Sequence, residues 1–345
     1  MSLQLSKNLE LFTRATEFAA ILAAMYRGHG NKEAADRAAV YAFRCIFNEI
    51  PMQGRIVSTE GSLDESYGLE YGEIVGSDPD GDQVDIAIDP LEGTTACAAG
   101  LNGAVTILTV APRDGLLNAE ETYMWKLAVG PAAKGKISLE RSVTENILEV
   151  AKALNKKPSQ LNIAILDRPR HKEMIEEIRA TGAMAMLLPA GDVMPALSTC
   201  FKDSGVDMLC GAGKGAEGVI TAAAIHALGG DFCGRLDLEL AEQKIGHKMN
   251  IYVPTHNMTM SDIIKKPAHT IAITAVTDAF FLKGVYYEEG RVHTNTFVIR
   301  NDSATWSKNH NSRDMFNHAW YNYIKKDPEI CKLFDSRMRR KMMMD

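Results

Sequence analysis

A long acidic stretch without basic residues is the feature that most constrains how this chain can fold. The 57 residues between Arg55 and Arg113 include no Lys, Arg or His. They include eleven carboxylates, namely Glu60, Asp64, Glu65, Glu70, Glu73, Asp78, Asp80, Asp82, Asp85, Asp89 and Glu92. Like charges repel at short range, so a compact fold must space these groups widely or supply cations. Because apolar segments run through the stretch, we expect it to be folded, and its oxygen donors are of the kind that Mg²⁺, Mn²⁺ and Ca²⁺ prefer.

The composition limits the class of protein. The chain has 345 residues, enough for two subdomains in one compact unit. A net charge of −6 gives no general electrostatic support to a nucleic-acid partner. The six cysteines form no Cys-x-x-Cys pair, no apolar run is long enough for a membrane span, and the first residues do not resemble a secretory signal. We therefore expect a cytoplasmic protein with reduced thiols and with neither nucleic acid nor membrane as a partner.

Hydrophobic periodicity predicts an α/β protein. In the first half we expect helices over 8–27 and 32–48 and strands over 55–59, 84–88 and 103–110, the last of them central because it is almost entirely apolar. From 160 to 230, strands at 161–166, 183–188 and 206–210 alternate with helices, which favours an α/β layer. The segment 145–160 is the candidate boundary between an N-terminal subdomain, 1–150, and a C-terminal one, 151–330. The basic tail from 325 onward is expected to be a surface or subunit-contact helix.

The segment Asp89-Pro90-Leu91-Glu92-Gly93-Thr94 has two interpretations. As structure, Asp, Pro and Glu at these spacings form a good helix start. As a site, two carboxylates at a strand end can hold divalent cations while free backbone N–H groups bind a phosphate. Thr94 adds a hydroxyl that could orient water, and the combination suits metal-assisted hydrolysis of a phosphate ester. Both interpretations remain open at this point.

Two further patterns suggest other ligands. Asp78-x-Asp80-x-Asp82 resembles a calcium loop, but Gln83 occupies the position that needs glycine, so we expect an acidic surface turn. Gly213-x-Gly215-x-x-Gly218, with Asp237 following, matches a dinucleotide fingerprint and leaves open an NAD-dependent oxidoreductase. Glu217 inside that motif would lie unfavourably close to a pyrophosphate, whereas it suits a metal ligand. A cation-binding protein without enzymatic activity is a third possibility.

The segment Arg168-Pro169-Arg170-His171, at an expected strand end, is either a solvated basic turn or an anion clamp, because guanidinium groups match phosphate geometry. A basic clamp and an acidic metal centre in one protein together suggest a substrate with two phosphates.

Taken together, these motifs resemble those of the class II fructose-1,6-bisphosphatases, the metal-dependent bacterial type. These are relatives of the lithium-sensitive inositol phosphatases, whose signature is Asp-Pro-hydrophobic-Asp/Glu-Gly-Thr. The resemblance covers about residues 8–300. It is carried by segments 31–36, 60–65, 84–94, 117–124, 129–135, 168–171, 191–192 and 215–218, and their order and spacing make it specific.

The resemblance implies roles for individual residues. The metal ligands would be Asp36, Glu60, Asp89, Glu92 and Glu217. Thr94 would help to activate the attacking water, supported by Lys32 and with Glu60 or Asp64 orienting that water. Substrate contacts would come from Glu92, Gly93, Thr94, Tyr123, Arg168, Pro169, Arg170, Gly191, Asp192 and Lys214. The remaining carboxylates of the base-free stretch, such as Glu70, Glu73, Asp78, Asp80 and Asp82, would face water.

The resemblance also implies a layered α/β/α/β/α fold, of the kind found in sugar phosphatases, with the active site in the cleft between two subdomains. The activity would be Mg²⁺- or Mn²⁺-dependent hydrolysis of the 1-phosphate of fructose-1,6-bisphosphate, as in gluconeogenesis, by a homo-oligomer (a dimer or tetramer). Sedoheptulose-1,7-bisphosphate is a second expected substrate, and an inositol-phosphatase-like enzyme acting on another phosphomonoester is an alternative. Departures from the family pattern, at Ser62, Thr95, Ala190 and Lys214, leave all the metal ligands in place.

Overall fold

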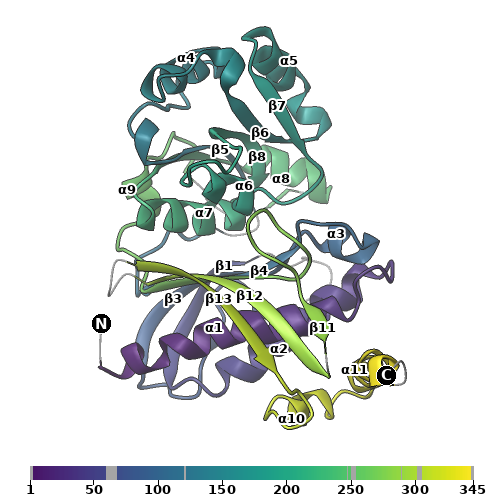
Figure 1. Ribbon diagram of the computed structural model, residues 1–345. Coiled ribbons are helices and arrows are strands. Elements are labelled where there is room, and N and C mark those ends of the chain that lie inside the picture. Colours follow the sequence, from purple (N-terminus) through teal and green to yellow (C-terminus); the bar gives the residue numbers. More distant parts are fainter. Residues whose placement is uncertain are drawn as a thin grey trace.

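Layers of helix and sheet alternate through the molecule (Figure 1), which confirms the expected α/β class. The computed structural model describes residues 3–59, 68–119, 122–246, 248–249, 254–288, 290–300 and 305–342. Three clusters of buried apolar side chains fill the spaces between the layers. Within the described residues, no helix is both long and apolar enough to span a membrane.

The larger sheet has eight strands in the order β11-β12-β10-β4-β3-β1-β2, with β13 paired along β12. β4 is central, as its apolar sequence predicted. The bounds are β1 Met52–Thr59, β2 Ile74–Val75, β3 Asp82–Glu92, β4 Val105–Pro112, β10 Thr270–Ala275, β11 Tyr286–Glu288, β12 Arg291–Arg300 and β13 Thr305–Arg313.

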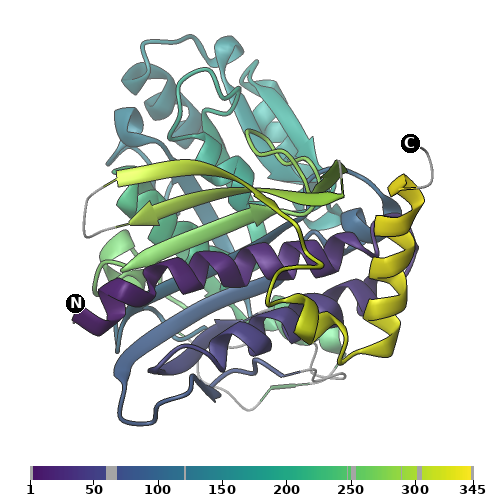
Figure 2. The same cartoon turned by 60° about the horizontal axis from the view of Figure 1, so that its bottom comes forward.

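Two N-terminal helices cover the outer face of this sheet, α1 (Leu3–Ala24) and α2 (Lys32–Phe47) (Figure 2). The side chain of Asn31 accepts a hydrogen bond from the backbone N–H of Ala34 at 2.9 Å, which confirms the expected N-cap. Alanines dominate the buried side of α2, so the helix packs closely against α1.

The smaller sheet has five strands in the order β7-β6-β8-β5-β9. Its strands are β5 Tyr123–Val129, β6 Asn162–Leu166, β7 Met184–Leu188, β8 Met208–Lys214 and β9 Asp231–Asp237. The remaining helices are α3 Thr94–Ala99, α4 Val143–Ala153, α5 Lys172–Ala180, α6 Val193–Ser198, α7 Gly215–Ala227, α8 Leu238–Ile245, α9 Met260–Ile263, α10 Tyr321–Ile324 and α11 Pro328–Met342. Short 3-10 turns lie at Pro131–Ala133, Pro158–Gln160 and Pro169–His171.

Helix α7 lies between the two sheets and contacts strands of both (Figure 1). It is therefore buried on every side from Gly215 to Ile225, as an apolar helix without a polar face should be. The chain moves to the smaller sheet at β5 and returns to the larger one at β10. The division into subdomains 1–150 and 151–330 stays a prediction, and the change of sheet does not fall at residue 150.

Of the two interpretations of segment 89–94, the helix start at Asp89 is wrong. Strand β3 continues through Glu92, Gly93 follows with a left-handed φ of 78°, and α3 begins only at Thr94. Asp89 Oδ1 accepts from the N–H of Leu91 at 3.0 Å, so its carboxylate closes a local turn. The functional interpretation of the segment, two carboxylates at a strand end, agrees with this geometry.

A β-bulge sets the direction of these two carboxylates. Asp89 pairs with Ile107 and Glu92 with Val105, so three steps along β3 match two along β4. Ile107 and Val105 point to one face of the sheet because they are two residues apart, and Asp89 and Glu92 therefore share that face. It is the face toward α7 and the smaller sheet, since Ile107 and Val105 belong to the apolar cluster there.

Arginines compensate part of the acidic stretch. Asp85 is fully buried and lies 2.9 Å from Arg55 Nη2 and 3.9 Å from Arg113 Nε. Glu73 accepts two hydrogen bonds from Arg44 Nη2, at 2.8 and 3.0 Å, so the expectation that it simply faces water is wrong. Asp80 is exposed to water, as expected, and its N–H donates to Asp78 Oδ1 in an exposed turn.

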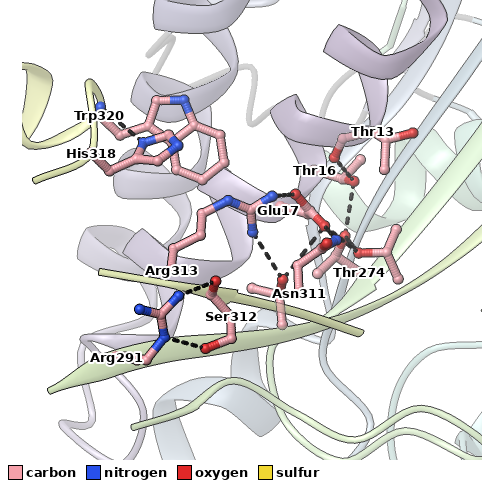
Figure 3. A network of polar contacts seen from close by, with 12 residues as sticks. Thr13, Thr16, Glu17, Thr274, Arg291, Asn311, Ser312, Arg313, His318 and Trp320 are labelled. Carbon is pink, nitrogen blue, oxygen red and sulfur yellow. Dashed lines mark hydrogen bonds and ion pairs between the residues drawn. The ribbon is translucent and has the colours of Figure 1, made fainter. Parts of the chain in front are cut away.

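A second buried charge ties α1 to the far edge of the larger sheet (Figure 3). Glu17, on α1 and 1% exposed, forms an ion pair with Arg313 and accepts a hydrogen bond from Asn311. The hydroxyls of Thr294 and Thr296 lie 3.5 and 3.4 Å from the same carboxylate. These partners come from β12 and β13, so one side chain joins the first helix to the last two strands.

The C-terminal segment packs back onto the N-terminal helices (Figure 2). The ring of Trp320 stacks on Phe18 at 4.9 Å, and the Arg313 guanidinium lies 4.8 Å from the Trp320 ring centre. Tyr41 Oη, on α2, donates to the carbonyl of Tyr323 at 3.0 Å. The expected tail helix is present as α11, and its segment completes the core beside α1 and α2.

Replacing Arg313 with Met should destabilise the protein by about 3–5 kcal/mol, because Glu17 would keep a buried charge without its ion-pair partner. Urea unfolding followed by circular dichroism measures this change. Arg291→Ala is the control: this exposed arginine on the neighbouring strand bonds only Ser312 at 2.7 and 2.8 Å and should cost less than about 1 kcal/mol. Equal losses in the two variants would contradict the assignment.

Candidate active site

The end of β3 meets the start of α6 where the two sheets approach each other. Glu92 Oε1 accepts hydrogen bonds from the N–H groups of Asp192 and Val193, at 2.9 and 3.0 Å. A Cβ on Gly191, whose φ is 70°, would lie 3.3 Å from the Glu92 carboxylate, so a small residue permits this approach. Three residues expected at the site, Glu92, Gly191 and Asp192, are thus adjacent.

A buried lysine lies in the same place. Lys126, on β5, has a fully buried side chain, and its Nζ is 2.8 Å from Asp192 Oδ1 and 2.7 Å from Asp192 Oδ2. The same Nζ is 3.5 Å from Glu217 Oε2 and 3.4 Å from the carbonyl of Lys214. The ammonium therefore connects Asp192 on one helix start with Glu217 on another.

Glu217 is in the first turn of α7, where Oε2 accepts the N–H of Lys214 at 3.1 Å. A carboxylate there is favoured by the helix dipole. Gly213 leaves room for the group: a Cβ on Gly213 would lie 2.4 Å from Asp192 Oδ2, 2.8 Å from Lys126 Nζ and 2.9 Å from Glu217 Oε2. The backbone of β8 can approach these charges only because residue 213 has no side chain.

The charges in this group are unequal in number. Three buried carboxylates, Glu92, Asp192 and Glu217, surround one buried ammonium. Burial raises the pKa of Glu92 well above its ordinary value, and the charges of Glu217 and Asp192 raise it further. Burial opposes the charge of Lys126, but Asp192 and Glu217 outweigh that effect and raise its pKa. The group carries excess negative charge that a bound cation would relieve.

The basic segment expected to bind anions lies beside this group. Arg168 donates to the carbonyls of Asp167 and Pro189 at 2.8 and 2.9 Å. Arg170 donates to the carbonyl of Ala212 at 3.2 and 2.5 Å, and its guanidinium lies 5.2 Å from the ring centre of Tyr123. Tyr123 and Arg170, two expected substrate contacts, are therefore together. Pro169 is exposed in the 3-10 turn between the arginines.

His171 has a structural role. It is fully buried, its Nδ1 lies 2.8 Å from the carbonyl of Leu166, and its Nε2 accepts the N–H of Ala212 at 2.8 Å. This pair of bonds requires the neutral ring with the proton on Nδ1. Burial lowers the pKa of His171, which agrees with that state. The histidine thus fixes the arginine turn against β8.

Thr94 is half-buried at the start of α3, and its hydroxyl donates to the carbonyl of Leu91 at 2.8 Å. That bond orients the oxygen and leaves its lone pairs as acceptors. The left-handed Gly93 makes the turn that separates Thr94 from the buried Glu92.

Two more expected site residues lie on α2, and two are not among the described residues. Lys32 is exposed at the start of α2, 3.8 Å from Glu33, so no contact with Thr94 supports its expected role. Asp36 is half-buried on the same helix. Glu60 and Asp64 lie outside the described residues. In the described part of the chain, no three His, Cys, Asp or Glu side chains converge on one point as ligands of a metal ion.

Sequence reasoning missed Lys126. The signal was a single charged residue in the apolar run Tyr123–Val129, whose burial is nearly continuous. A single lysine in an otherwise apolar strand indicates either that the strand lies at the edge of a sheet or that the lysine is buried with charged partners.

The glycines of the dinucleotide-like motif serve packing. A Cβ on Gly215 would lie 2.6 Å from Thr122 Oγ1, and one on Gly218 would lie 2.4 Å from Met124 Sδ. Asp237, which that motif would need for a ribose, caps α8 and accepts from Trp125 Nε1 at 2.8 Å. Strands β8 and β9 are separated by the antiparallel β5, unlike the adjacent parallel strands of a dinucleotide-binding unit.

Known proteins similar to this chain agree with one another. Residues 7–312 match the family described as bacterial fructose-1,6-bisphosphatase, glpX-encoded. The D-fructose 1,6-bisphosphatase class 2/sedoheptulose 1,7-bisphosphatase of Synechococcus sp. (strain CC9902) is 41% identical over 305 residues, covering 84% of this chain and 91% of that protein. Fructose-1,6-bisphosphatase 1 class 2 of Escherichia coli (strain K12) is 38% identical over 307 residues, covering 85% and 91%.

Among solved structures, an inositol monophosphatase from Anabaena (Nostoc) sp. PCC 7120 matches 59% of this chain and 72% of its own. Its TM-score is 0.31 and its sequence identity 14%, which is too little to carry an argument. The sequence matches suffice: the chain belongs to the class 2 fructose-1,6-bisphosphatases, the family of phosphatases that its motifs resemble.

Proposed function

We propose that this protein hydrolyses the 1-phosphate of fructose-1,6-bisphosphate, giving fructose 6-phosphate and inorganic phosphate. The observation that carries the proposal is the buried group of Glu92, Asp192, Glu217 and Lys126, placed where the two sheets meet and beside Arg170 and Tyr123. A site with excess negative charge next to arginines suits a cation and a phosphorylated sugar together.

The donor set fits a divalent cation such as Mg²⁺ or Mn²⁺. Hard carboxylate oxygens are buried, and the net charge around Lys126 is negative, which favours a doubly charged ion. Asp89, Glu92 and Glu217 would hold it, joined by Asp36 and by Glu60 from outside the described residues. When bound, such an ion neutralises phosphate oxygens and makes water more acidic.

The protein's own groups bind and orient the substrate in this proposal. The N–H groups at the start of α3 bind the 1-phosphate, helped by Gly93 and Lys214. Thr94, with Glu60 or Asp64, orients the attacking water, and Lys32 adds positive charge. Arg168 and Arg170 bind the other phosphate, with Pro169 shaping their turn, while Tyr123, Gly191 and Asp192 contact the sugar. We also propose that the enzyme works in the cytoplasm as a homo-oligomer.

Sedoheptulose-1,7-bisphosphate is the second proposed substrate, favoured because several relatives are named for both activities. Phosphate release from a panel tests both proposals: each bisphosphate, inositol phosphates and a bisphosphorylated nucleotide, each with Mg²⁺ or Mn²⁺. We expect release from the two sugar bisphosphates only. Release from inositol phosphates alone would overturn the proposed substrate class.

Asp89→Asn should lower kcat by about a thousandfold or more, because the site loses a charged ligand while the side chain keeps its shape. Circular dichroism should show a folded protein, since the amide oxygen can still accept from Leu91. Asp80→Asn, in the exposed turn of the same acidic stretch, should keep its activity. Normal turnover by the Asp89 variant would rule out its assigned role.

Gly213→Ala should reduce turnover by about a hundredfold, because its new Cβ would displace Asp192 and Glu217. Gly54→Ala is the matched control: its Cβ would meet only side-chain ends, that of Ile86 at 2.6 Å and those of Met52 and Val75 at 3.2 Å, far along β1 from the site. We expect the control to lose some stability and little activity, as measured by thermal unfolding and phosphate release. Similar activity in the two variants would show that position 213 is not close to the reaction.

A further inference from the structure

Lys126 has no role in the reaction proposed above, although it is buried beside the site. Its side chain is 0% exposed, compared with 4% for Asp192 and 12% for Glu217. An ammonium in such a place is costly unless it is paired, so its presence needs a reason.

The contacts of Lys126 reach three segments of the chain. Its Nζ bonds both oxygens of Asp192, at the start of α6, and lies 3.5 Å from Glu217, in the first turn of α7. The backbone N–H of Asp192 in turn donates to Glu92, at the end of β3. Lys126 therefore holds Asp192 directly and Glu92 through Asp192. Because its ammonium already lies between Asp192 and Glu217, these carboxylates point toward it.

The charge of the group follows from these contacts. When all three are ionised, Glu92, Asp192 and Glu217 contribute three negative charges, and Lys126 contributes one positive charge. Lys126 therefore offsets one of the charges near a divalent cation that Asp89, Glu92 and Glu217 would hold. Without Lys126 the same carboxylates would attract that cation more strongly.

We propose that Lys126 is a positioning residue that fixes Asp192 for the substrate and lowers the net negative charge that the Glu92, Asp192 and Glu217 group presents to a divalent cation. The inference rests on the proposed function for the role of Asp192. Its part concerning charge also rests on a cation binding at this site. An ordinary structural ion pair would contribute to stability and would have no defined effect on metal affinity.

Three variants separate these roles: Lys126→Met, Asp192→Asn, and the two combined. Mn²⁺ affinity is measured without substrate, from the loss of the free Mn²⁺ signal in electron paramagnetic resonance. Removing the ammonium should tighten Mn²⁺ binding about tenfold, and removing the carboxylate should weaken it about tenfold. The double variant keeps the wild-type net charge, so its affinity should return close to that of the wild type.

Kinetics supply the second measurement. Both single variants and the double variant should raise KM for fructose-1,6-bisphosphate, because Asp192 is displaced or altered in each. Lys152→Met is the control, since Lys152 is an exposed lysine, 74% accessible, that pairs with Glu149 on α4 and should change neither quantity. Tighter metal binding together with a higher KM is a combination that general loss of structure does not produce.

Weaker Mn²⁺ binding by Lys126→Met than by the wild type would overturn the inference, as would a double variant that stays far from the wild-type affinity. If Lys126→Met does not fold, the Asp192→Asn protein and the double variant still differ only at residue 126, and the double variant should bind Mn²⁺ more tightly. Since no substrate enters the Mn²⁺ measurement, its failure is distinct from the failure of wild-type protein to hydrolyse a sugar bisphosphate.

Discussion

Excess negative charge buried between two sheets is the constraint on which the site depends. Apolar packing alone would bring β3, α6 and α7 together, since all three contribute to one hydrophobic cluster. The carboxylates of Glu92, Asp192 and Glu217 resist that approach, because charges of one sign repel more strongly where water is excluded. Lys126 and the N–H groups at the start of α6 reduce this repulsion, and a bound cation would reduce it further.

Local backbone features give these charges their positions. The bulge in β3 turns Glu92 toward the smaller sheet, on the same side as Asp89. The missing side chain at Gly213 lets β8 come within contact distance of Asp192 and Glu217. Each feature weakens a regular strand, by an unpaired residue or by lost packing. Such departures from regular strand geometry are expected at functional sites.

Much of the fold could be predicted from the sequence because local patterns determined it. The Asn31 cap, the α1 and α2 periodicity, and the alternation between 160 and 230 depend on residues close together in the chain. The return of β10 to β13 to the first sheet could not be predicted, since it depends on pairing over long distances in sequence. The helix start at Asp89, one of two interpretations left open, failed for a related reason: pairing with β4 extends the strand through a segment whose residues favour a cap.

The site could be predicted in part. Residue patterns pointed to Glu92, Glu217 and Arg170, and the family resemblance added Asp192 and Tyr123; the structure places these residues near one another in two linked groups. Lys126 was missed, because a lysine reveals its role only through partners that are 66 and 91 residues away in the chain. The role of Lys32 stays a prediction, because a one-turn spacing from Asp36 does not say where an exposed side chain points.

The two arginines at the ends of the base-free stretch have a consequence for how the first sheet assembles. Arg55 on β1 and Arg113 just after β4 approach one carboxylate, Asp85, on the strand between them. Arg55 and Arg113 are 58 positions apart, so they approach the same carboxylate only if β3 lies between β1 and β4 in the correct register. A slip by one residue would turn Asp85 to the opposite face, away from both cations. The contacts of Asp85 with Arg55 and Arg113 therefore favour the correct alignment of the three strands. Both arginines come from the borders of the stretch, because the stretch itself has no basic residue.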